Sequence, residues 1–105
     1  MFFPRLFAAL SRRRADVPAA QDAVIVVRGG YHPDVVIARA GAPVRLRFRR
    51  EESGRCSDTV LLPALGRFAE LPEGHTVSID CGTPEPGEYE FSCARGAARG
   101  LLVVR

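Results

Sequence analysis

The sequence lacks the residues and motifs that would identify an enzyme. It contains no lysine and no tryptophan, one methionine, two histidines and three cysteines among its 105 residues. It has no zinc-binding motif, P-loop, GxGxxG fingerprint or nucleophile elbow. Ser92, the two histidines and the scattered aspartates form no recognisable catalytic triad. The sequence therefore favours a protein without enzymatic activity.

No hydrophobic run is long enough to cross a bilayer. Residues 1–10 are apolar but interrupted by a proline and an arginine, and they are about half of the roughly 20 residues that a membrane-spanning helix needs. Three arginines at 12–14 follow this run, whereas a secretory signal places its positive charge first. Residues 1–22 are therefore predicted to be an apolar and basic tail with a linker, without a clear signal peptide.

Three interpretations of this tail remain open. It is a frayed end without function, a peripheral membrane contact through residues 1–14, or the end of a membrane span that starts upstream. The last two interpretations favour the cell envelope or a membrane, and not the cytoplasm, as the location of the protein.

The charge of the chain gives little indication of a partner. All 15 basic residues are arginine, and with 12 acidic residues the net charge is +3. Such exclusive use of arginine looks like a bias of genome composition. A basic excess this small does not predict binding to nucleic acid.

From residue 23 onward, short apolar runs alternate with turns rich in glycine and proline, which is typical of a β-sandwich. Strands are predicted at 24–28, 35–39, 44–49, 59–62, 76–80, 88–92 and 101–104, with room for one helical turn within 63–74. In the third strand Val44, Leu46 and Phe48 face inward, and Arg45, Arg47 and Arg49 face water. The sequence therefore predicts one all-β domain over residues 23–105, a Greek-key β-sandwich of about seven to eight strands.

Residues 86–104 are predicted to form a turn, a strand, a loop of small residues with one cysteine, and a closing strand. Tyr89, Phe91 and Cys93 share one parity, so a strand with period two turns them to the buried face. The Cys93 thiol then lies where the last inward side chain meets the loop.

This stretch resembles the ligand loop of cupredoxins, the small Greek-key copper domains. The closest group is the cupredoxin-like domains of EfeO-type iron-uptake proteins and those associated with copper-transporting membrane proteins. The landmarks of the resemblance run in order through 29–33, 40–46, 56–63, 71–72 and 86–93. The resemblance implies a soft-metal, copper-binding or copper-handling module, whose partner is a membrane metal transporter or another metal-handling protein.

The ligand loop departs from the pattern of this resemblance. Blue-copper sites use two His, one Cys and a weak axial Met, with a His and the Met soon after the Cys. After Cys93 the chain has neither, and Arg95 and Ala97 stand where the closer group carries methionines. Blue-copper electron transfer is therefore not expected. In the closer group a cysteine commonly replaces the upstream His, and here that position matches Cys56, which implies a metal site of Cys56 and Cys93.

Three interpretations of Cys56 and Cys93 stay open. Two thiolates suit Cu(I), with a third ligand from a partner or from His75. The two cysteines could instead form a disulfide, if their Cα atoms come within about 7 Å in an oxidising compartment. They could also be inert residues of a site that has lost its metal. Cys81 is predicted at the opposite end of the sandwich, as a small buried hydrophobic residue.

Two arginines lie on the same loop as Cys93. Arg95 and Arg99 could bind an anion or an acidic partner, although a simple solvated loop is also open. The alternative function is therefore a metal-free interaction module that presents this basic loop to an acidic protein. The charge of Arg95 is further expected to lower the pKa of a nearby thiol.

Overall fold

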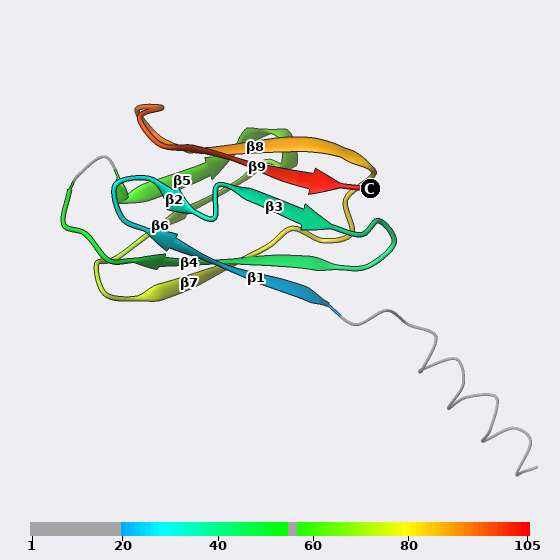
Figure 1. Cartoon of the computed structure of the whole chain (residues 1–105), viewed down its shortest axis with the longest axis horizontal. Helices are drawn as coiled ribbons and strands as arrows, with labels where there is room; N and C mark the ends of the chain where they lie inside the picture. The colour runs from blue at the N-terminus through cyan, green and yellow to red at the C-terminus, as the bar shows by residue number, and fades with distance from the viewer. Residues whose placement is uncertain (1–19, 55–56) are drawn as a thin grey trace, which may run out of the picture.

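Two β-sheets pack face to face in the computed structural model, which describes residues 20–54 and 57–105 (Figure 1). One sheet has four strands in the order β2-β1-β4-β7, and the other has five in the order β3-β9-β8-β5-β6. The strands are β1 (Gln21–Val27), β2 (Tyr31–His32), β3 (Val35–Ala38), β4 (Val44–Arg50), β5 (Thr59–Leu62), β6 (Arg67–Glu70), β7 (Thr76–Asp80), β8 (Gly87–Cys93) and β9 (Arg99–Val104). The predicted all-β sandwich is confirmed. Most of the predicted tail lies outside the described residues, although β1 already begins at Gln21.

Residues 20–54 and 57–105 form nine strands, one more than the expected seven to eight, and two of them were not predicted. β2 has only two residues, which is too short for a period-two pattern. β6 has no clear alternation, and its Phe68 is 72% exposed. The expected helical turn is present as the 3-10 helix η2 (Pro63–Leu65). No helix in the described part of the chain is long and apolar enough to cross a membrane.

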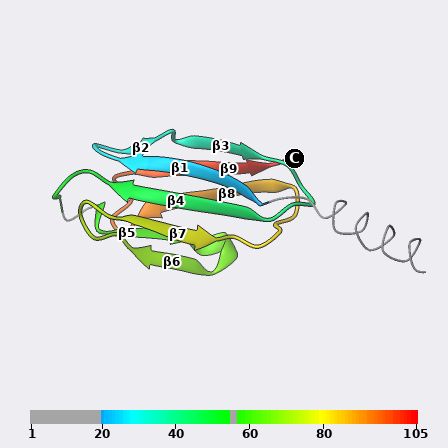
Figure 2. The ribbon, with the colours of Figure 1, turned by 90° about the horizontal axis from the view of Figure 1, so that it is seen from below.

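β4 shows how the sequence pattern produces the sandwich. Its inward residues Val44, Leu46 and Phe48 are buried, and its outward arginines Arg45, Arg47 and Arg49 line the outer face, as predicted. Asp22 lies 3.4 Å from Arg47, and Glu51 lies 3.1 Å from Arg49. Figure 2 looks onto this sheet, where β1 runs parallel to β4 and lies between β4 and β2.

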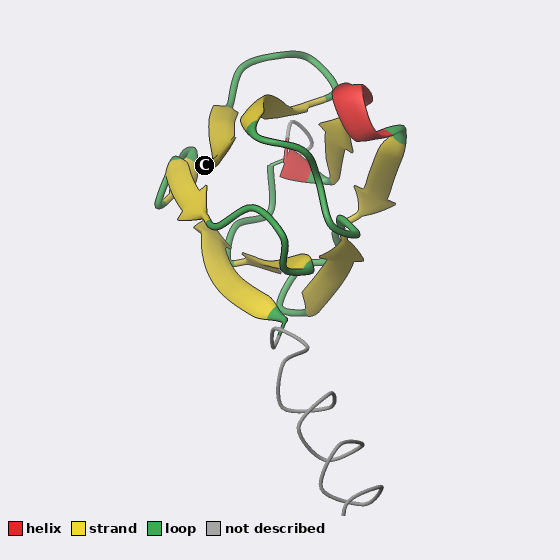
Figure 3. Cartoon of the chain, turned by 90° about the vertical axis from the view of Figure 1, so that its right-hand side faces the viewer, coloured by secondary structure: helices red, strands yellow, loops and turns green. Residues whose placement is uncertain are grey.

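Three aromatic rings join the two sheets at the centre of the core. Tyr31 packs edge-on against Phe91 at a centroid distance of 5.1 Å and against Phe48 at 5.9 Å. Phe48 and Phe91 are 5.5 Å apart, also edge to face. This geometry is favoured by the ring quadrupoles. The cluster belongs to β2, β4 and β8, so it fixes the spacing of the two layers, which Figure 3 shows end-on.

Candidate functional site

The site is built around Cys93, the last residue of β8. Its side chain is buried, and the residue pairs with Val60 at the start of β5. The loop to β9 closes tightly on it, because the Cys93 N–H donates to the Ala98 carbonyl at 3.1 Å and the Gly96 N–H donates to the Cys93 carbonyl at 2.9 Å. Gly96 has φ of 74°, a left-handed conformation that a residue without Cβ adopts readily.

The same loop stabilises the negative form of the sulfur. The Ala98 N–H lies 3.4 Å from the Cys93 Sγ and donates to it. Burial raises the pKa of Cys93, but backbone N–H groups outweigh burial and bring it below the ordinary value for a thiol; they belong to Ala98, Arg95, Ala97 and Gly96. Arg95 therefore acts through its backbone amide, whereas the sequence had suggested its guanidinium. A thiolate is the form of cysteine that binds metals.

A cavity of about 240 Å³ lies at this end of the sandwich, lined by Gly29, Gly30, Glu52, Ser57, Ala97 and Ala98. Tyr31 directly follows this glycine pair and is 4% exposed. Burial, and then the charges of Cys93 and Glu52, raise the pKa of Tyr31, which indicates that both groups lie near the phenol. Among residues 20–54 and 57–105, the Tyr31 hydroxyl has no hydrogen-bond partner.

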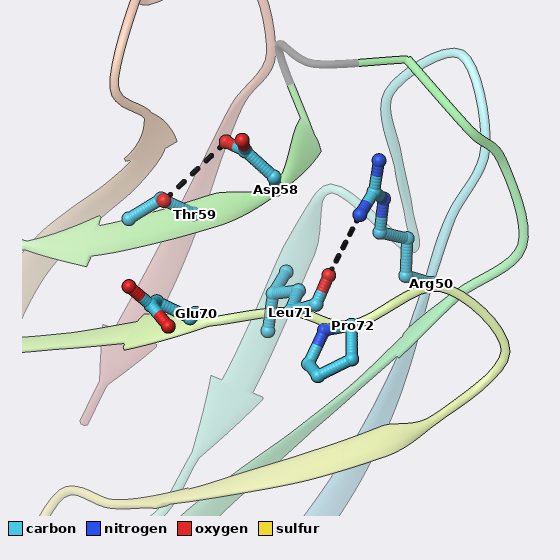
Figure 4. A pocket seen from close by; sticks show the side chains of 6 residues that line it. All are labelled: Arg50, Asp58, Thr59, Glu70, Leu71 and Pro72. Carbon is cyan, nitrogen blue, oxygen red and sulfur yellow. Dashed lines mark hydrogen bonds between the residues drawn. The ribbon is translucent and has the colours of Figure 1, made fainter.

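Arg50 braces the segment that follows β4. Its guanidinium is buried and donates to the carbonyl oxygen of Leu71 at 2.9 Å (Figure 4), to the carbonyl oxygen of Gly54 at 2.6 Å and to the Ser57 hydroxyl at 3.2 Å. It also lines a second cavity of about 300 Å³, with Asp58, Thr59, Glu70, Leu71 and Pro72. Sequence reasoning missed Arg50, although its parity with Phe48 could have indicated an inward side chain.

Glu52 fixes the same segment from its other side. Its carboxylate accepts the backbone N–H of Gly29. This bond, followed by a hydrogen bond from Ser57, lowers the pKa of Glu52. The segment on both sides of positions 55 and 56 is therefore held by side chains of its own, close to the Cys93 loop.

The predicted cysteine pair is described only in part. Cys56 lies outside the described residues, so its pairing with Cys93 stays a prediction. Cys81 is buried at the other end of the sandwich, where its N–H donates to the Val44 carbonyl at 2.8 Å. Burial, and then the charge of Asp80, raise the pKa of Cys81, so its neutral form is favoured. The predicted role of Cys81 as a small buried hydrophobic residue is confirmed.

The histidines supply no ready ligand set. His32 is exposed, as predicted, and its Nε2 lies 2.8 Å from the Arg28 carbonyl. His75 is also exposed and precedes β7 at the Arg50 end of β4, where its carbonyl accepts the Arg50 N–H at 3.2 Å. In the described part of the chain, no group of three or more His, Cys, Asp or Glu side chains could bind a metal ion.

The two loop arginines are exposed, as the sequence led us to expect. Arg99 begins β9 and lines a shallow cavity that also contains Asp34 and Glu90. Arg95 lies on the loop itself. No ion pair between described residues includes Arg95 or Arg99, so their binding to an anion or acidic partner stays a prediction.

Comparisons with known proteins agree with this architecture. No curated protein sequence matches the chain. A copper-binding protein solved by NMR in the apo form is 28% identical, with a TM-score of 0.77, covering 82% of this chain and 88% of its own. The metal-binding domain of the Cu(I)-exporting P-type ATPase CopA of Streptococcus pneumoniae D39, solved with Cu(I), is 26% identical, with a TM-score of 0.78 and coverage of 82% and 86%.

More distant structures show the fold alone. Auracyanin B is 17% identical, with a TM-score of 0.64, covering 81% of this chain and 88% of its own.

Residues 2–104 match the family model described as the cupredoxin-like domain. The chain therefore belongs to the cupredoxin-like domain family.

Proposed function

We propose that this domain binds and handles Cu(I), with the Cys93 thiolate and Cys56 as its ligands. The observation that carries the proposal is the buried Cys93 sulfur in a loop whose N–H groups lower its pKa. A soft thiolate of this kind is a ligand that Cu(I) prefers. The similarity to a copper-binding protein and to a Cu(I)-loaded domain, at 28% and 26% identity, supports the same metal.

The donor set fits Cu(I) transfer better than electron transfer. The single methionine of the chain is Met1, and neither a histidine nor a methionine follows Cys93. Blue-copper centres depend on both residue types. We therefore infer a non-enzymatic module that holds Cu(I) between thiolates and exchanges it with other ligands. Bound copper would supply its affinity for sulfur, and the N–H groups of the Cys93 loop would favour the deprotonated sulfur by lowering its pKa.

The proposed setting is a membrane copper system. We infer that the chain is closest to the cupredoxin-like domains of the EfeO-type and copper-transporter-associated group, because the landmarks at 29–33, 56–63 and 86–93 follow that pattern. Its partner would be a membrane metal transporter or another metal-handling protein in the cell envelope. Residues 1–14 would contact the membrane surface through their apolar and arginine side chains.

An anaerobic Cu(I) titration against a competing chelator tests this function. We expect the reduced wild-type protein to bind one equivalent competitively, and Cys93→Ser and Cys56→Ser to lose this binding. Cys81→Ser is the matched control, since Cys81 is equally buried but lies at the opposite end of β7 from the site. A wild-type protein that binds no copper in competition, or a Cys93→Ser variant that binds like wild type, would contradict the proposal.

The alternative function, a metal-free interaction module, is favoured by one observation. Arg95 and Arg99 are both exposed, on or beside the loop that carries Cys93. If they dock an acidic partner, Arg95→Ala and Arg99→Ala weaken the complex, and salt weakens it in wild type, because exposed charges are screened. Such a complex in a protein that binds no Cu(I) would favour the alternative over copper handling.

A further inference from the structure

The Tyr31 hydroxyl is a buried polar group without a hydrogen-bond partner among the described residues. Tyr31 is 4% exposed, and none of the described residues forms a hydrogen bond with its hydroxyl. A buried hydroxyl without a partner is unfavourable for folding. The other tyrosine behaves differently, since the Tyr89 hydroxyl donates to the Glu85 carbonyl at 2.6 Å. A phenylalanine would fill the Tyr31 position without this cost. The hydroxyl therefore does not serve the stability of the copper-free protein, and we look for another role.

The aromatic cluster fixes where the hydroxyl lies. The Tyr31 ring is held edge-on between Phe48 and Phe91, at centroid distances of 5.9 and 5.1 Å. Phe91 is two residues before Cys93 on the same inward face of β8. Gly29 and Gly30, which directly precede Tyr31, line the same cavity as Ala97 and Ala98 of the Cys93 loop. The hydroxyl therefore lies at the Cys93 end of the core.

The Cys93 sulfur receives its hydrogen bonds from one side only. Within the part of the chain that the structure describes, its one side-chain hydrogen bond comes from its own loop, where the Ala98 N–H donates to Sγ at 3.4 Å. Tyr31 belongs to β2 of the opposite sheet, and a thiolate can accept more than one hydrogen bond. Glu52, the other charged neighbour of the phenol, is partly exposed, and its carboxylate accepts the Gly29 N–H. The Cys93 sulfur, in contrast, is buried in the core, as Tyr31 is.

We propose that Tyr31 is a positioning residue of the copper site, whose hydroxyl donates a hydrogen bond to the Cys93 thiolate when that sulfur holds Cu(I). This inference rests on the proposed function and extends it to a residue that is not a ligand. A hydrogen bond to a ligand atom orients it and adjusts its strength as a donor. The hydroxyl would then stabilise the loaded protein while costing stability in the free one.

Two isosteric variants separate this role from a structural one. Tyr31→Phe removes the hydroxyl but keeps the ring in its cluster, and Tyr89→Phe is the matched control. We expect Tyr31→Phe to weaken Cu(I) binding about tenfold or more, as charge-assisted hydrogen bonds do. The melting temperature of the copper-free variant should stay unchanged or rise, because no satisfied hydrogen bond is lost.

Tyr89→Phe should give the reverse pattern. It removes a formed hydrogen bond, so the copper-free protein should melt at a lower temperature while Cu(I) affinity stays that of wild type. Wild-type affinity in Tyr31→Phe would overturn the role of Tyr31 and leave the proposed function standing. A lower melting temperature in copper-free Tyr31→Phe would also overturn it, by indicating a partner for the hydroxyl without metal. A wild-type protein that binds no Cu(I) would overturn the proposed function, and this inference with it.

Discussion

Replacing Gly100 by alanine is expected to strain the core next to the Cys93 loop. Gly100 is buried in β9 and pairs directly with Phe91 in β8. A Cβ atom at Gly100 would overlap the Cε2 and Cζ atoms of the Phe91 ring, and it would lie 2.9 Å from the backbone oxygen of Asp34. Carbon atoms in ordinary contact are about 3.5–4.0 Å apart, so the ring would have to move.

The surroundings leave the ring little room to do so. Phe91 is 0% exposed and packs against both Tyr31 and Phe48. Inserting a methyl group into a well-packed core costs about 1–3 kcal/mol, and occasionally more. Because a ring and a backbone oxygen both obstruct the new atom, we expect a loss of about 3 kcal/mol in the free energy of unfolding. For a domain of this size, that lowers the melting temperature by about 12 °C or more.

Urea denaturation and thermal melting measure this loss. Gly54→Ala is the matched control, because a Cβ at Gly54 meets nothing within 4 Å and its backbone is not in the left-handed region. We expect the control to change the free energy of unfolding by less than about 0.5 kcal/mol. If Gly100→Ala were as stable as this control, the close packing of β9 against Phe91 would be wrong.

Two further variants test the segment after β4. Arg50→Lys should lose about 2 kcal/mol of stability in urea denaturation. The guanidinium reaches Ser57, Leu71 and Gly54 with three different nitrogens, and the single nitrogen of an ammonium cannot reach all three acceptors. An unchanged midpoint would contradict this bracing role. The Glu52 pKa is lowered from 4.5, so its contribution is present above that value and is lost as the pH falls through the lowered pKa. Between about pH 6 and about pH 3, the free energy of unfolding should therefore decrease less in Glu52→Gln than in wild type. An equal decrease in the two proteins would refute this.

The fold could be predicted because its information is local. In β4 the alternation of Val44, Leu46 and Phe48 with arginines determines which face is buried, and glycine and proline determine where strands end. The position of Cys93 followed from the same parity, and the structure agrees. The two missed strands, β2 and β6, are held by pairing with neighbours, which a pattern within one short segment does not contain.

The site was less predictable because its chemistry depends on distant parts of the chain. The guanidinium of Arg50 is buried, although a charged group normally prefers water. Its hydrogen bonds to Ser57, Gly54 and Leu71 compensate for the lost hydration. The unpartnered hydroxyl of Tyr31 is likewise a property of the packed core, since it depends on which groups come near. Period-two reasoning finds inward positions, but it does not find their hydrogen-bond partners.

The pairing of β3 with β9 has a consequence for how the protein is made. Val35 pairs with Leu101, 66 residues later in the chain, and the two strands run parallel. At about 5–20 residues per second, a ribosome needs roughly 3 to 13 s to add the partner strand after Val35 has been made. During that interval β3 lacks its strand partner, because β9 is its one neighbour among the strands of residues 20–54 and 57–105. Pairing of β3 therefore waits for β9, and a chain cut short before Arg99 would leave β3 without its strand partner and expose β8 as the new sheet edge, both prone to pairing with other chains.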